Sequence, residues 1–359
     1  MTNQYFEEID LEAAFKNIVE QHEKMEVAAQ PDKSVFDDLK DLEQLGWLRE
    51  KPPARKYVFM SEELDGSKSG FLPASKVCMI VSPGGCGKTF LLTHCALAAA
   101  TGTHWLHTKA VEPMKVLFIA AEEDKNELWL RFHNMAKSLG LHNRPDLMKM
   151  ALKNIIPITD QGVSMRLINE KNEPTETYNK LKALIEADKD IKLVILDPAA
   201  QFMGCETETN NAAATDFVRL IGALNLIGGK PTVLISHHTN KSALNPTAND
   251  KLPGFNQSFS RGSSALVDGA RWLMGMQRSE MKDSQRSIFI KVLKSNYTKL
   301  GEILEFQQDY ANSGILRYIG EASEETMKEK KITKAWQDAE EHRTTPFSPF
   351  NHSPGASHD

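Results

Sequence analysis

A glycine-rich loop between an apolar run and a helix-forming run is the part of this sequence best suited to chemistry. Residues 77–89 read VCMIVSPGGCGKT, and FLLTHCALAAA follows directly. Backbone N–H groups of such a loop and the N-terminus of such a helix favour bound phosphate, and the lysine reaches the β- and γ-phosphates. A P-loop has glycine where this chain has Ser82, but the GGxGKT part of the pattern is intact. We therefore expect ATP to contact Ser82, Gly84, Gly85, Cys86, Gly87, Lys88, Thr89 and Phe90.

An acidic residue ends a second apolar run. KLVILD at 192–197 has the composition of a buried strand and ends in Asp197. In an open parallel sheet, ligands bind at the carboxyl ends of the strands, which is where both the P-loop and this acid are expected. Asp197 is therefore the predicted partner of Mg²⁺, together with the hydroxyl of Thr89. The alternative is that Asp197 is a surface acid that caps a loop.

Acidic residues also follow the apolar run KVLFIA at 115–120, which we expect to lie next to the P-loop strand. Glu122 is the first of these acids, and a carboxylate there can orient or deprotonate the water that attacks the γ-phosphate. Acids also favour helix N-termini, so we assign Asp124 to the N-cap of the next helix. If Glu122 is not the catalytic base, Glu123 becomes the candidate.

A histidine pair and a long polar loop end the run VLISHHTNK at 233–241. Neighbouring side chains diverge, so His237 and His238 form a poor metal site, but a polar residue here can hydrogen-bond the γ-phosphate. A loop as long as 239–262 is usually functional or disordered. The loop carries Lys241, Lys251 and Arg261 among aromatic residues, a combination that can contact single-stranded DNA. The alternative is a surface loop that binds no ligand.

Alternating strand-like and helix-like runs between residues 76 and 320 are the elements that must position these groups. The strand candidates are 77–81, 115–120, 152–157, 192–196 and 231–236, and the helix candidates are 88–100, 124–139, 175–187 and 213–228. This alternation indicates βαβ units and an α/β fold with a parallel central sheet. From residue 270 the runs are strand-like only, which predicts an antiparallel extension on one edge of that sheet.

The two ends of the chain differ from this core in composition. Residues 1–50 carry 13 acidic and 5 basic residues, and the runs 9–28 and 33–48 have helical periodicity. We therefore predict three regions: an acidic helical appendage over 1–50, an ATPase core over 51–320, and a charged, then disordered tail over 321–359. Outside the first 50 residues the charges nearly balance, so any nucleic-acid binding must come from local patches.

Membrane and secretory classes do not fit this composition. No apolar run approaches the ~20 residues that span a bilayer, and the acidic N-terminus lacks an apolar signal segment. The 4 cysteines show no CxxC spacing, which favours free thiols in a reducing compartment. We expect a cytoplasmic protein without membrane contact.

Six segments, taken in order, resemble the plasmid RepA-type hexameric replicative DNA helicases, which are RecA/DnaB-like P-loop ATPases. They are SPGGCGKT, AAEE, VILD, SHH, SRGSSALVDGARW and LKSNY, and the resemblance covers roughly residues 52–320. It implies that Lys88 and Thr89 bind nucleotide and Mg²⁺, that Glu122 is the catalytic base, and that Asp197 is the Walker B acid.

The same resemblance implies roles at a subunit interface. His238 is the γ-phosphate sensor, Arg271 is the arginine finger that acts on the next subunit's ATP, and Lys294 lies near the interfacial nucleotide. DnaB-type proteins carry an arginine two residues beyond that lysine, where this chain has Asn296. The finger role therefore falls on Arg271.

These observations predict a RecA-like ATPase that assembles into a homo-hexameric ring and couples ATP hydrolysis to movement along single-stranded DNA. The acidic appendage is expected to pack on the core or on a neighbouring subunit; the alternative is a docking module for another protein, such as a replication or recombination protein. Two other functions stay open. One is a non-helicase DNA-binding ATPase, such as a recombinase or recombination mediator, and the other is a regulatory ATPase that docks a protein partner.

Overall fold

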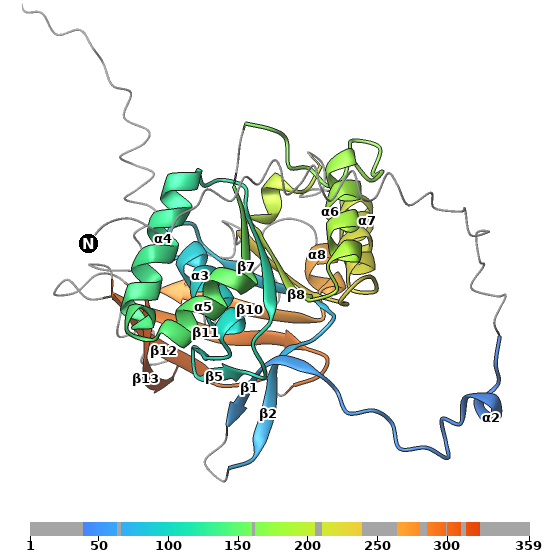
Figure 1. Cartoon of the computed structure of the whole chain (residues 1–359). Coiled ribbons are helices and arrows are strands. Elements are labelled where there is room, and N and C mark those ends of the chain that lie inside the picture. Colours follow the sequence, from blue (N-terminus) through green and yellow to red (C-terminus); the bar gives the residue numbers. More distant parts are fainter. Residues whose placement is uncertain are drawn as a thin grey trace, which may run out of the picture.

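A nine-stranded mixed sheet forms the centre of the molecule in the computed structural model (Figure 1). The structure describes residues 39–62, 66–159, 162–204, 210–238, 264–279, 286–298, 300–309 and 314–323. The strand order is β13-β12-β11-β10-β3-β9-β8-β6-β7. Neighbours from β10 to β7 pair in parallel, and β10 to β13 pair antiparallel. The predicted α/β class, with a parallel central sheet and an antiparallel C-terminal extension, is confirmed.

The strands of this sheet lie close to their predicted positions. The parallel ones are β3 (Val77–Ser82), β6 (Lys115–Ala120), β7 (Ile155–Thr159), β8 (Ile191–Asp197), β9 (Thr232–His238) and β10 (Trp272–Arg278). The antiparallel ones are β11 (Arg286–Ser295), β12 (Ile303–Gln308) and β13 (Leu316–Ala322).

The prediction that strand 115–120 lies next to the P-loop strand was wrong. β9 and β8 separate β3 from β6 in the sheet. The connection from β3 to β6 passes two strand positions that the later strands β8 and β9 fill, so order along the sequence does not give order across the sheet.

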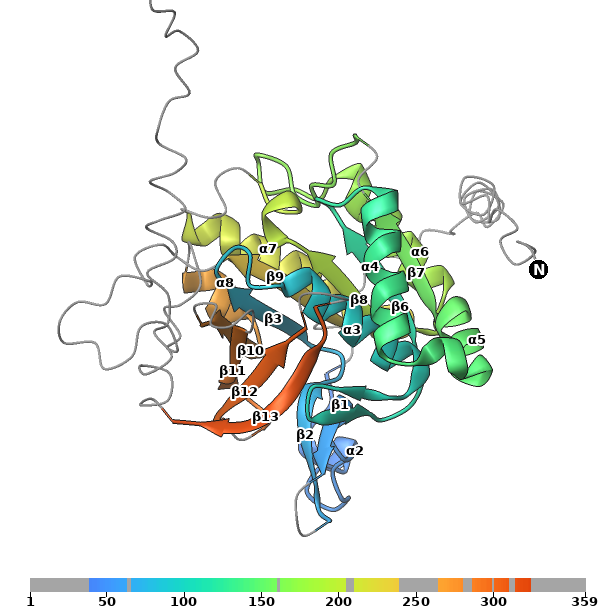
Figure 2. The same ribbon diagram turned by 90° about the vertical axis from the view of Figure 1, so that its left-hand side faces the viewer.

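Helices cover both faces of the sheet (Figure 2). One group is α3 (Lys88–Thr101), α4 (Lys125–Ser138) and α5 (Pro145–Asn154), and the other is α6 (Glu176–Ala187), α7 (Asn211–Leu224) and α8 (Ser264–Gly269). Helices α3 and α4 share a core cluster with Phe118, and the second group shares one with Leu117; the side chains of these two neighbours point to opposite faces of β6. Helix α5 packs on α3 and α4 through Ala151. Asp124 is the N-cap of α4 as predicted, since its carboxylate accepts from the Glu127 N–H at 2.9 Å.

Two predicted elements needed correction. The strand expected over 152–157 begins only at Ile155, because residues 145–154 form α5, which starts with a proline in its first turn. The helix expected over 33–48 is described from residue 39, and α2 covers only Leu42–Leu45. It ends at Gly46, whose φ of 66° lies in the left-handed region. The helix expected over 9–28 lies outside the described residues.

A second, four-stranded sheet was not predicted. It contains β1 (Tyr57–Glu62), β2 (Lys68–Pro73), β4 (His104–Trp105) and β5 (Thr108–Ala110) in the order β2-β1-β5-β4. Within this sheet Phe59 packs against Trp105, with 5.0 Å between ring centroids. Phe71 joins it to the main sheet by packing against Trp272 of β10 at 5.4 Å. In the described part of the chain, every helix is too short or too polar to cross a membrane.

Candidate active site

The P-loop connects the end of β3 to the start of α3. Gly85 and Gly87 have φ angles of 68° and 90°, which residues with a Cβ rarely adopt. Lys88 folds back under the loop, and its Nζ donates to the Ser82 carbonyl at 3.2 Å and to the Pro83 carbonyl at 3.3 Å. Burial lowers the pKa of this lysine, and the nearby Cys86, Asp197 and Glu122 oppose that shift. A buried ammonium held by carbonyls is suited to exchange them for phosphate oxygens.

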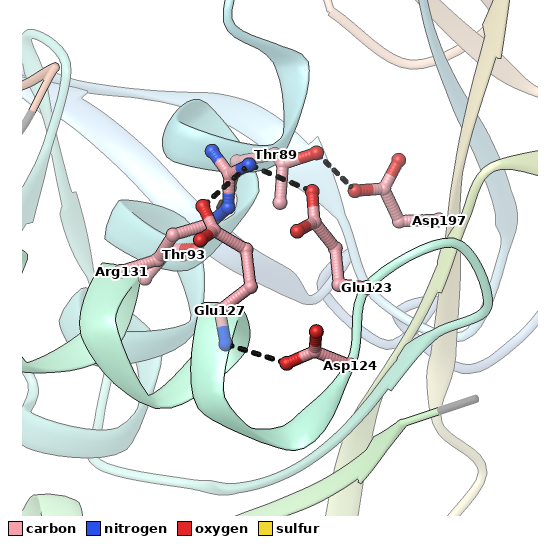
Figure 3. Close-up of polar contacts among 7 residues, drawn as sticks. All are labelled: Thr89, Thr93, Glu123, Asp124, Glu127, Arg131 and Asp197. Atoms are coloured by element: carbon pink, nitrogen blue, oxygen red, sulfur yellow. Dashed lines mark hydrogen bonds and ion pairs between the residues drawn. The ribbon is translucent and has the colours of Figure 1, made fainter. Parts of the chain in front are cut away.

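The threonine that follows the lysine meets the strand-end aspartate (Figure 3). Thr89 Oγ1 donates to Asp197 Oδ2 at 2.7 Å, and the hydroxyl of Ser236 on β9 donates to the other carboxylate oxygen. Asp197 is 5% exposed. Mg²⁺ binds few protein oxygens and keeps several waters or phosphate oxygens, so a hydroxyl and a carboxylate beside the P-loop fit it. Thr89 and Asp197 are the residues that would hold the ion.

A histidine at the end of β9 faces the same lysine. β9 pairs with β3 so that His238 lies opposite Ser82. Lys88 Nζ lies 3.3 Å from His238 Nδ1, so the ammonium can donate to that ring nitrogen. His237 is buried within the sheet. Of the two histidines, His238 is the one placed at the P-loop.

Two glutamates follow β6 and have different partners. Glu122 is exposed, and its Oε1 accepts from the Gln201 amide at 3.1 Å. Glu123 is half-buried and pairs with Arg131 of α4 at 2.8 Å, which also pairs with Glu127 at 3.0 Å (Figure 3). Burial raises the pKa of Glu123, and Arg131 opposes that rise. Glu122 is therefore held by a neutral amide, whereas Glu123 is held by a cation.

Two predicted site residues, Arg271 and Lys294, lie at the ends of the strands opposite to the P-loop. The Arg271 N–H donates to the carbonyl of Val77, the first residue of β3, at 2.9 Å. The P-loop follows the last residue of that strand, roughly 17 Å away along the sheet. Lys294 Nζ donates to the carbonyls of Val267 and Asp268 at 2.9 and 2.8 Å. Neither side chain belongs to the P-loop site of its own chain.

The surroundings of Arg271 are open. The side chain is exposed and lines a cavity of about 660 Å³ between α7, α8 and the start of β3, together with Lys76, Arg219 and Asp268. Burial lowers the pKa of Lys294, and the nearby Arg271 adds to that shift, while Asp268 opposes it. The predicted DNA contacts Lys241, Lys251 and Arg261 lie outside the described residues.

Sequence reasoning missed several residues that the fold brings to the P-loop. Arg278, at the end of β10, donates from Nη1 to the Gly85 carbonyl at 2.8 Å. Gln308, at the end of β12, lies against Gly87. The ring of Phe90 is stacked under the guanidinium of Arg131 at 4.7 Å. These partners come from distant parts of the chain, so no local pattern indicated them. Ser236, which donates to Asp197, was also missed, although its place directly before the histidine pair could have indicated it.

A parallel sheet that brings a P-loop lysine, a threonine and a strand-end aspartate to one edge defines a P-loop ATPase. Residues 35–243, more than half of the chain, match the protein family described as the AAA domain, and the chain belongs to that family. A solved structure, the KaiC-like protein PH0186 from the hyperthermophile Pyrococcus horikoshii OT3, aligns with 75% of this chain and 100% of its own. The two share 13% sequence identity, with a TM-score of 0.44.

Proposed function

We propose that this chain is an ATP-dependent helicase or translocase of a plasmid, phage or other mobile replicon, acting on single-stranded DNA as a homo-hexameric ring. The placement of Arg271 is the observation that supports it. Its backbone is fixed to the start of β3, whereas the P-loop follows the end of that strand. An exposed arginine there is too far from the P-loop of its own chain but is available to the nucleotide of another copy, as a ring with shared sites requires.

Each residue of the cis site has a role in this proposal. Lys88 leaves the carbonyls of the loop and binds the β- and γ-phosphates. Bound Mg²⁺ would neutralise phosphate charge, held by Thr89 and Asp197. Glu122, steadied by the Gln201 amide, takes a proton from the attacking water.

The remaining roles concern neighbouring copies and DNA. Arg271 of the adjacent copy stabilises the charge that develops on the γ-phosphate, and such fingers contribute roughly 10³–10⁵ in rate. His238 senses the loss of the phosphate because it shares a contact with Lys88. The chain continues from His238 into the segment that carries Lys241, Lys251 and Arg261, so a change at the histidine can pass directly to the DNA contacts.

The decisive experiment measures ATP hydrolysis with and without single-stranded DNA, alongside unwinding of a forked duplex. We expect DNA to stimulate hydrolysis and the duplex to be unwound, with Lys88→Ala inactive in both assays. Stimulation without unwinding would instead indicate a recombinase or recombination mediator. An ATP hydrolysis rate that does not change when DNA is added, with no DNA retained in a filter-binding assay, would indicate a regulatory ATPase whose appendage docks a protein.

The proposed DNA contacts have a separate test. Alanine at Lys241, Lys251 and Arg261 removes three positive charges that can each neutralise a phosphate. The salt dependence of single-strand affinity should therefore flatten by about 0.7 for each charge removed. A matched control removes the same charge from α4 and α5, at the exposed Lys137, Lys149 and Lys153. An unchanged slope in the first variant would move the DNA site elsewhere, with segment 203–212 after β8 as the next candidate.

A further inference from the structure

The antiparallel extension touches the P-loop at successive points. Arg278 at the end of β10 donates to the Gly85 carbonyl at 2.8 Å. A Cβ on Gly87 would lie 2.7 Å from Gln308 Nε2 at the end of β12, so the amide packs directly on this glycine. A Cβ on Gly314, two residues before β13, would lie 2.7 Å from the Phe90 ring. The outer side of the loop is therefore covered by residues from strands far along the chain.

Among these contacts, the buried amide of Gln308 is the one whose polar character the structure does not explain. It is 4% exposed, and neither its Nε2 nor its Oε1 has a hydrogen-bond partner among the described residues. A buried amide that makes no hydrogen bond costs free energy, and such groups in native proteins require an explanation. An apolar side chain of the same size would fill this space without that cost. The amide is therefore expected to find its partners in another state of the protein.

The arrangement of the loop suggests which state that is. Lys88 Nζ is bonded to the carbonyls of Ser82 and Pro83, inside the loop that Gln308 covers. When a triphosphate takes over the lysine, those carbonyls lose their donor and the loop that they restrain is free to shift. The backbone at Gly87, against which the amide packs, carries both an N–H donor and a carbonyl acceptor, which matches the two unmade hydrogen bonds of a glutamine.

We propose that Gln308 is a positioning residue of the nucleotide site, whose amide hydrogen-bonds the P-loop backbone near Gly87 only when an adenine nucleotide occupies the loop. The inference rests on nucleotide binding at this P-loop and is independent of movement on DNA. Gln308 stabilises the occupied loop from outside and destabilises the empty one. The antiparallel extension is thereby part of the nucleotide site of its own chain.

The test compares Gln308→Met with Gln307→Met. Methionine keeps the length of the side chain and removes both polar atoms, and Gln307 is the half-buried neighbour whose side chain points to the other face of β12. Without nucleotide, we expect Gln308→Met to melt at the wild-type temperature or roughly 2–4 °C above it. With a non-hydrolysable ATP analogue, we expect its affinity to be about tenfold weaker than wild type. Gln307→Met should bind the analogue as the wild type does, which shows that the nucleotide site itself is sound.

The opposite signs of the two effects separate this role from simple packing. A variant that loses both stability and affinity, or one that keeps wild-type affinity, would overturn the proposal. Hydrogen exchange on the unmutated protein gives a second measurement that does not depend on a variant. The analogue should slow exchange in β12 as well as in the loop, and an unchanged β12 would also overturn it.

Discussion

Arg271 and Arg278 flank the two ends of a single buried strand, β10. At the start of the strand, the Arg271 N–H donates to the Val77 carbonyl. At its end, the Arg278 guanidinium donates to the Gly85 carbonyl of the P-loop. The residues between the two arginines are all buried, and Trp272 to Gly275 pair in parallel with β3. One rigid element therefore connects the P-loop of a chain with the arginine that, in our proposal, serves the next copy.

Mixing two inactive variants should restore activity if Arg271 acts on a neighbouring copy. Arg271→Ala keeps an intact P-loop, and Lys88→Ala keeps an intact Arg271. Only mixed assemblies contain interfaces where the intact P-loop of an Arg271→Ala copy meets the intact Arg271 of a Lys88→Ala copy. Partial ATPase activity should therefore appear on mixing and be highest near equal amounts. The measurement is hydrolysis at fixed total protein across mixing ratios, with subunit exchange verified by mass. If exchange occurs and no ratio recovers activity, Arg271 has a structural role only.

The protonation of Lys88 should limit nucleotide capture at alkaline pH. Burial lowers its pKa from the ordinary 10.5, so the empty enzyme loses the ammonium below that pH. Bound phosphates stabilise the charged form and raise the pKa again. Since kcat/KM reports the free enzyme and kcat the complex, the alkaline limb of kcat/KM should lie at lower pH than that of kcat. Coincident limbs, or a kcat/KM limb at the ordinary value, would contradict this assignment.

The parts of the fold that could be predicted are those encoded in contiguous residues. The loop from Ser82 to Thr89 and the acid at the end of β8 are read from short runs, because a strand end and a helix start are adjacent in the chain. The order of β3, β9, β8 and β6 could not be read that way. It depends on pairing between segments far apart, which local periodicity does not record.

The same limit applies inside the site. Gln308 and Arg278 reach the P-loop from strands near the other end of the chain, and their own neighbours in sequence carry no sign of a phosphate site. The run 152–157 was misassigned for a local reason, since Ile155 begins β7 directly where α5 ends. Apolar residues shared between a helix end and a strand start have no clear period.

Buried His94 should make the fold acid-sensitive. Burial lowers its pKa from 6.5 to about 4, against the opposing hydrogen bond to the His104 carbonyl at 3.0 Å. Between these values the unfolded chain binds a proton that the folded chain does not, so stability falls as pH falls. From about pH 7 to about pH 5 this single group should cost about 2 kcal/mol. Urea denaturation at both values should show that loss shrinking in His94→Gln, which retains a donor for the carbonyl. An equal loss in both proteins would assign the acid sensitivity to other groups.

The two glutamates after β6 should respond differently to the same substitution. Glu122→Gln keeps the size and loses the base, so ATP should still bind while turnover falls by about 10²–10⁴. Glu123→Gln leaves Glu122 intact but removes the charge that pairs with Arg131 at 2.8 Å. Arg131 retains Glu127 at 3.0 Å, so this second variant should lose much less turnover.

Single-turnover hydrolysis with nucleotide binding measured in parallel separates the two outcomes, since it isolates the chemical step from ATP capture. The physical reason for the difference is the partner of each acid. Glu122 accepts one hydrogen bond from the neutral Gln201 amide, whereas the carboxylate of Glu123 is held in an ion pair with Arg131. Wild-type turnover in Glu122→Gln, together with a large loss in Glu123→Gln, would reverse the assignment and make Glu123 the base.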